Sequence, residues 1–84
     1  MNETKIFSIN GKLEELPLFE RGDRVRIKDY VALTPIPTGA VERTENNGLF
    51  VYIIWDYKIF KSKDGGKVEL GTLWLADGIQ LLDS

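Results

Sequence analysis

The sequence predicts an all-β fold, a small five-stranded barrel that follows an N-terminal extension. Glycine and proline recur too often along the 84 residues to leave room for long helices. Apolar and charged side chains alternate over residues 23–28, which is typical of a strand with one buried face. An Asn-Gly pair at residues 47–48 lies between apolar segments and is a strong hairpin signal. Closing such short strands into a barrel removes the open edges that favour aggregation.

The N-terminal extension comprises the first 18 residues. Residues 6–9 favour a strand, Asn10-Gly11 a turn, and residues 13–16 one helical turn before Pro17. Because this segment is too apolar for a disordered tail, we expect it to pack on the barrel of residues 19–84.

The first barrel strand is expected over residues 23–28. Val25 and Ile27 alternate there with three cations, so these two apolar side chains should point into the core. Two prolines make residues 34–39 a loop, and a second strand follows over residues 40–43.

The third strand, residues 49–56, is apolar on both faces. Val51, Ile53 and Trp55 share the face that should point inward. The other face carries Phe50, Tyr52 and Ile54. Such a strand is either covered on both sides or exposes one face as a contact surface. The N-terminal extension is one expected cover for this face, and a protein partner is the other.

Turn signals continue to the end of the chain. Residues 57–63 and 67–75 flank Asp64-Gly65-Gly66 and read as a second hairpin. Residues 73–78 favour one helical or 3₁₀ turn closed by glycine, and residues 79–82 a short last strand.

Four segments between residues 19 and 82 resemble small Src-homology-3-like (SH3-like) barrels. Residues 19–27 resemble the opening of these barrels, and Gly39-Ala40-Val41 their second strand. Residues 50–56 resemble the third strand, and residues 73–82 the closing turn and last strand. Related barrels include the KOW domains of ribosomal and transcription factors and small accessory subunits of photosynthetic and oxidoreductase complexes. The resemblance implies a fold, and a fold hosts many functions.

Composition argues against most enzyme classes. The chain has no histidine and no cysteine, which removes disulfides, thiolate nucleophiles, zinc or Fe–S ligation and histidine base catalysis. No phosphate loop, dinucleotide fingerprint or EF-hand spacing is present. We therefore expect a non-enzymatic chain without a cofactor or a metal.

The expected function is an interaction module, an accessory or regulatory subunit that docks on a protein partner. Aromatic anchors dominate such contacts. The expected contact residues are Tyr30, Phe50, Tyr52 and Trp74. Self-association into a homo-oligomer through the exposed face of the third strand stays open as a third interpretation.

Nucleic-acid binding is the alternative function. The cations that would contact phosphates are Arg21, Arg24, Arg26, Lys28, Lys58, Lys61 and Lys63. Tyr57 and Phe60 lie beside the last three lysines, and aromatic rings can stack on bases. Against this, the formal net charge is -2, whereas a nucleic-acid module usually has a basic excess.

Nothing in the sequence indicates a membrane partner. The longest apolar run, residues 49–55, is far shorter than the roughly 20 residues that span a bilayer. The start of the chain carries no apolar segment behind a basic head. We therefore expect a cytoplasmic location.

Overall fold

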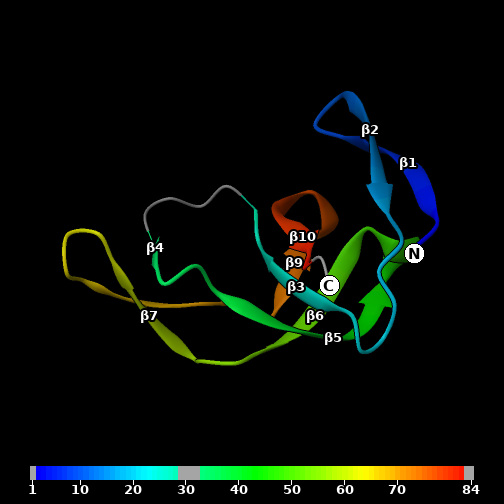
Figure 1. Cartoon of the computed structure of the whole chain (residues 1–84). Helices are drawn as coiled ribbons and strands as arrows, with labels where there is room; N and C mark the ends of the chain where they lie inside the picture. The colour runs from blue at the N-terminus through cyan, green and yellow to red at the C-terminus, as the bar shows by residue number, and fades with distance from the viewer. Residues whose placement is uncertain (1, 29–32, 83–84) are drawn as a thin grey trace.

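Short strands and tight turns make up the regular structure of this chain, which confirms the predicted all-β fold (Figure 1). The computed structural model describes residues 2–28 and 33–82. In chain order the strands are β1 (Thr4–Ile9), β2 (Lys12–Pro17), β3 (Arg24–Ile27), β4 (Leu33–Thr34), β5 (Thr38–Glu45), β6 (Phe50–Trp55), β7 (Ile59–Ser62), β8 (Lys67–Glu69), β9 (Leu73–Leu75) and β10 (Ile79–Leu81). Two 3₁₀ turns lie between strands: η1 (Asn46–Gly48) connects β5 to β6, and η2 (Ala76–Gly78) connects β9 to β10.

Five strands form one antiparallel sheet in the order β10-β3-β5-β6-β9. This sheet is the predicted five-stranded unit. Its two end strands, β9 and β10, are joined through η2, and within residues 2–28 and 33–82 no ladder pairs them. The barrel is therefore not closed by hydrogen bonds in that part of the chain.

The inward side chains of this sheet build the main hydrophobic core. Val25, Val51 and Ile53 are fully buried there, as the alternation predicts. Ile27 is also buried, but it joins a second cluster with Leu33 and Phe60. Trp55 and Trp74 are partly buried and pack against both clusters, so the two indoles connect the halves of the core.

The hairpin between β5 and β6 forms where the Asn-Gly signal predicts it. Asn46 and Asn47 have φ values of 53° and 58°, and Gly48 has 94°. Asparagine and glycine tolerate this left-handed region better than other residues, so the sequence fits the turn. The turn between β1 and β2 uses the same chemistry at Asn10 and Gly11, with φ values of 51° and 79°.

The predicted helical turn over residues 13–16 is wrong, because this segment belongs to β2. β1 and β2 pair over six residues each, from Thr4 opposite Pro17 to Ile9 opposite Lys12. The left-handed turn at residues 10–11 brings the two segments side by side, and the resulting ladder overrides local helix preference.

The N-terminal hairpin, β1 and β2, packs on the barrel at a different place from the one expected. Its buried Phe7, Ile9 and Leu16 join the main core, and its contacts reach η2. The outward side chains of β6 take no part in that cluster, so the expected cover over Phe50 and its neighbours is wrong. Figure 1 shows the hairpin at one end of the molecule.

The segment after β6 departs from the prediction in two respects. Residues 67–75 form two strands, β8 and β9, instead of one, and they belong to different sheets. β8 pairs with β7, which pairs on its other side with β4, and the three strands form an arm that projects from the main sheet (Figure 1). The helical turn predicted over residues 73–78 is confined to η2, because Leu73–Leu75 pairs with β6.

Candidate functional site

Five apolar side chains lie together on the outer face of β6 and β9. We call them the outer apolar strip, and they are Phe50, Tyr52, Ile54, Leu73 and Leu75. Phe50 pairs with Leu75, and Tyr52 with Leu73, so the two strands place these side chains next to each other. Ile54 is 51% exposed, Leu73 47% and Leu75 37%. Contiguous apolar surface of this kind marks interaction sites more often than scattered apolar residues do.

The alternation of β6 explains why the strip faces outward. Val51 and Ile53 fill the core, so the residues between them must point to the other face. On the β5 side the strip ends at charged residues. The Arg43 guanidinium lies 4.1 Å from the centre of the Tyr52 ring, and its Nε donates to Glu45 at 3.0 Å. An apolar centre with a polar border resembles the layout of protein interfaces.

The strip lies beside an open strand edge. Ile53 donates its N–H to the Thr72 carbonyl at 2.7 Å, and Ala76 donates to the Leu49 carbonyl at 2.8 Å. Because hydrogen-bonded pairs alternate along an antiparallel ladder, the backbone groups of Leu73 and Leu75 point away from β6. Within residues 2–28 and 33–82 no strand pairs with this outer edge of β9.

The residues expected to contact a partner do not all lie on the same surface. Phe50 and Tyr52 lie in the strip, whereas Trp74 points inward against Trp55, with 5.8 Å between ring centroids at 74°. Both indole N–H groups donate to the Gly71 carbonyl, at 3.0 and 2.8 Å. Tyr30 lies outside the described residues.

Sequence reasoning missed Leu73 and Leu75 as surface residues. Trp74 is the residue expected at the contact surface, and alternation along residues 73–75 would then turn both leucines inward. The register of β9 against β6 decides the matter, since Trp74 pairs with the buried Val51 and must share its inward face. The Leu-Trp-Leu pattern carries this signal only when it is read as a strand.

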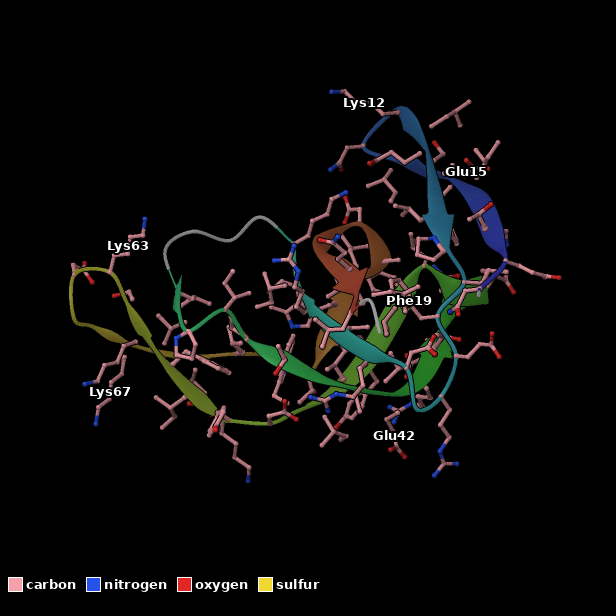
Figure 2. The ribbon with its side chains drawn as sticks, in the orientation of Figure 1. Lys12, Glu15, Phe19, Glu42, Lys63 and Lys67 are labelled. Atoms are coloured by element: carbon pink, nitrogen blue, oxygen red, sulfur yellow. The ribbon has the colours of Figure 1, made fainter. Side chains whose placement is uncertain are left out.

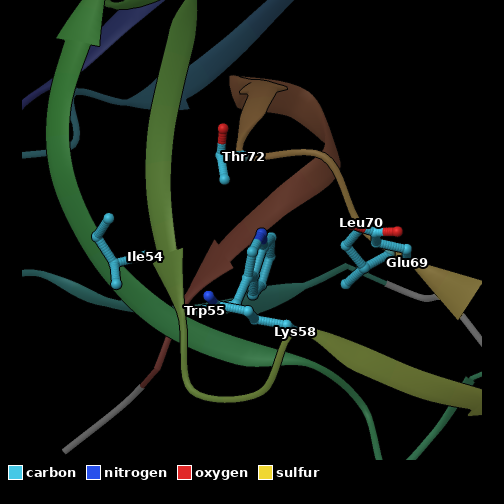
Figure 3. Close-up of a pocket in the computed structure, with 6 residues that line it drawn as sticks. All are labelled: Ile54, Trp55, Lys58, Glu69, Leu70 and Thr72. Atoms are coloured by element: carbon cyan, nitrogen blue, oxygen red, sulfur yellow. The ribbon is translucent and has the colours of Figure 1, made fainter.

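A hollow opens next to the strip at the end of β6 (Figure 3). Trp55 and Leu70 form its apolar walls, and Lys58 and Glu69 lie at its rim, as the close-up shows. Its volume is about 210 Å³, which is below the range of roughly 300–1,000 Å³ typical of small-molecule sites. It suits a single side chain of a partner better than a free ligand.

The arginines of β3 are engaged by groups within the barrel. Arg24 donates to both carboxylate oxygens of Asp56, at 3.0 and 2.5 Å, and the Thr38 hydroxyl donates to the same carboxylate at 2.6 Å. Arg26 donates to the side chain of Gln80 at 2.9 Å. These contacts tie β3 to β10 and to Asp56, which follows β6 and also accepts from β5, so they support a structural role for Arg24 and Arg26.

We expect acid to weaken the fold through Asp56. The Arg24 guanidinium and the Thr38 hydroxyl hold the pKa of this carboxyl below its usual value of 3.8. A lowered folded-state pKa means that the contribution to stability is present above the unfolded pKa and is lost as pH falls through the folded pKa. Asp56→Asn should therefore cost stability at neutral pH, and its difference from the wild type should shrink in acid. Denaturant unfolding of both proteins over that pH range measures this; a constant difference contradicts it.

Lysines gather on the arm. Lys61 of β7 lies directly opposite Lys67 of β8, and Lys63 lies near the tip (Figure 2). Like charges in opposite positions destabilise a strand pair. The Ser62 hydroxyl and the Gly66 amide hold the pKa of Asp64 below its usual value, so this acid is engaged in the turn. Among the described residues no carboxylate forms an ion pair with these lysines.

Comparisons of the chain with protein-family models, curated proteins and solved structures gave no match. In the part of the chain that the structure describes, no helix is long and apolar enough to cross a membrane. Within the described residues, the outer apolar strip and the lysines of the arm are the features from which a function is proposed below.

Proposed function

We propose that this chain is a non-enzymatic interaction module that docks on a protein partner through the outer apolar strip. The observation that carries the proposal is the exposure of Ile54, Leu73 and Leu75 on two paired strands. A chain of 84 residues has little apolar side-chain material to spare from its core. The exposure of several apolar side chains together on one face is therefore best explained by a contact surface.

Two aromatic residues supply the anchors of the proposed contact. Phe50 and Tyr52 are partly buried within the strip. The Arg43 guanidinium stacked on Tyr52 limits the motion of that ring. A side chain that is fixed before binding loses less conformational entropy when a partner covers it. This makes Tyr52 the expected centre of the contact.

We expect charge in the strip to abolish capture of the partner. Ile54→Lys and Leu73→Lys each place an ammonium group on the proposed contact without touching the core. The matched controls are Ile6→Lys and Leu13→Lys, which alter residues 62% and 76% exposed on the N-terminal hairpin. Affinity capture from native extract, read by mass spectrometry, should lose the same proteins with both strip variants and keep them with both controls. Equal capture by all four variants contradicts the proposed surface.

Nucleic-acid binding is the second candidate, and the arm favours it. Lys61 and Lys67 face each other, and no described carboxylate forms an ion pair with either, so an anionic backbone would relieve their repulsion. A hollow of about 360 Å³ lies on the same arm, lined by Pro35, Tyr57, Ile59, Phe60 and Lys61. An aromatic ring beside a lysine can hold a base and its phosphate.

A titration with single-stranded oligonucleotide tests this second candidate. It predicts binding at low salt that falls with added salt, with a slope of about −0.7 per phosphate contacted. Lys61→Glu with Lys67→Glu should remove the binding, whereas Lys12→Glu, at the far hairpin in Figure 2, should leave it unchanged. Fluorescence anisotropy measures the affinity. The absence of binding by the wild type at low salt removes this candidate.

A further inference from the structure

The edges of the strands differ in how they are protected against pairing with another chain. β8 carries Lys67 and Glu69, and β2 carries several charges and ends at Pro17. β10 lies beside the N-terminal hairpin, whose Leu16 lines a hollow together with Ile79. Charges, prolines and covering segments are the usual means of keeping a strand edge from pairing.

In the part of the chain that the structure describes, β9 lacks these forms of protection. Residues 70–76 contain neither a charged residue nor a proline, and they include the whole of β9. The N–H and C=O groups of Leu73 and Leu75 line its outer edge, as the ladder to β6 requires, and none of them has a backbone partner within residues 2–28 and 33–82. The side chains of the same two leucines are exposed. This edge offers backbone hydrogen bonds and apolar contact at once.

The edge is also complementary to itself. When two β9 strands are placed antiparallel about a two-fold axis at Trp74, Leu73 of each copy lies opposite Leu75 of the other. Both leucines point their backbone groups outward, so each of these pairs is a hydrogen-bonded pair of an antiparallel ladder. The four leucine side chains then meet on one face, where cross-strand apolar pairs stabilise a sheet. The strip becomes continuous across the axis.

We infer that a second copy of this chain pairs with β9, which joins two five-stranded sheets into one. The inference goes beyond the proposed function, because it concerns the backbone edge of β9 and leaves most of the outer apolar strip open to a different protein. A two-fold contact is the commonest way in which identical chains associate. The Leu-Trp-Leu edge carries no charge, so two identical edges can pair without placing like charges opposite each other.

Leu75→Pro is the decisive variant. Leu75 has φ −67°, which a proline adopts without strain, and its N–H does not bond to β6. The substitution therefore removes one edge donor from each copy and leaves the ladder within the sheet intact. Leu75→Val is the matched control, since it keeps the N–H and an apolar side chain. Leu73→Lys is a second disruptive variant, in case Leu75→Pro fails to fold.

Sedimentation equilibrium of the full chain over a wide range of concentration is the measurement. The wild type should change from monomer to dimer mass as concentration rises, and Leu75→Val should do the same. Leu75→Pro should weaken the association by about tenfold or more, because each copy loses a hydrogen bond, while its thermal unfolding stays close to that of the wild type. If Leu75→Pro does not fold, Leu73→Lys should abolish the dimer and Leu13→Lys should not.

Three outcomes overturn the inference. A wild type that remains monomeric at every concentration shows that no second copy binds. Equal weakening by Leu75→Pro and Leu75→Val shows that side chains alone make the contact. A dimer that survives Leu73→Lys shows that another surface makes it. A monomeric chain whose strip still captures a different protein from extract leaves the proposed function standing, so the two failures can be told apart.

Discussion

We expect Ile53→Ala to lower the free energy of unfolding by about 2–5 kcal/mol, as large-to-small changes in a core do. Ile53 is 0% exposed and lies at the centre of β6, in the middle of the main cluster. Removing its outer carbon atoms leaves a cavity that neighbours from several strands line. The remaining chain has little reserve, because a domain of this size buries a smaller share of its surface than a larger domain does.

The next residue along the strand is the matched control. Ile54 has the same side chain but is 51% exposed on the outer apolar strip. Ile54→Ala should change the free energy of unfolding by about 0.5 kcal/mol, in the range of surface substitutions. Denaturant unfolding of both variants measures the difference. Similar losses at the two positions contradict the assignment of inward and outward faces on β6.

Gly39→Ala should be the most damaging change outside the side-chain core. A Cβ at Gly39 would lie 2.5 Å from the Ile54 carbonyl oxygen, 2.8 Å from Cγ2 of Ile53 and 3.0 Å from Cα of Trp55. Gly39 pairs with Trp55 on one side and with Val25 on the other, so backbone has to move to admit a methyl group. We expect a loss of about 1–3 kcal/mol in the free energy of unfolding, the usual cost of overpacking.

Gly71→Ala is the control for this prediction. Nothing lies within 4 Å of a Cβ built at Gly71, and its φ is not in the left-handed region. The same substitution there should leave the free energy of unfolding unchanged or slightly higher, because alanine restricts the unfolded chain. If the two glycine variants are equally stable, β5 does not approach β6 as closely as the structure has it.

The fold could be predicted where the chemistry is local. The alternation around Val25 and Ile27 and the turn at Asn47-Gly48 each depend on a few neighbouring residues, and both predictions are confirmed. The prediction of a helical turn at residues 13–16 failed because Leu-Glu-Glu-Leu fits a helical turn as well as a strand. The six-residue register with β1 decides between them, and it depends on the pairing of the two segments rather than on residues 13–16 alone.

In the candidate site, too, some residues can be predicted from local alternation, whereas the orientation of others depends on how the strands pair. The outward face of β6 follows from its own alternation, so Phe50 and Tyr52 could be named from the sequence. Leu73 and Leu75 could not, because their orientation depends on how β9 pairs with β6. The open edge of β9 is a property of the whole sheet order. No local pattern of residues specifies which strand stands at the end.

Amide hydrogen exchange in β9, read by NMR at low and high protein concentration, tests the central claim most directly. The N–H of Trp74 faces β6 and should be protected at both concentrations. The N–H groups of Leu73 and Leu75 face the open edge, so they should exchange rapidly in dilute protein and become protected as the concentration rises. Slow exchange of these two amides in dilute protein, or rapid exchange at every concentration, contradicts the account.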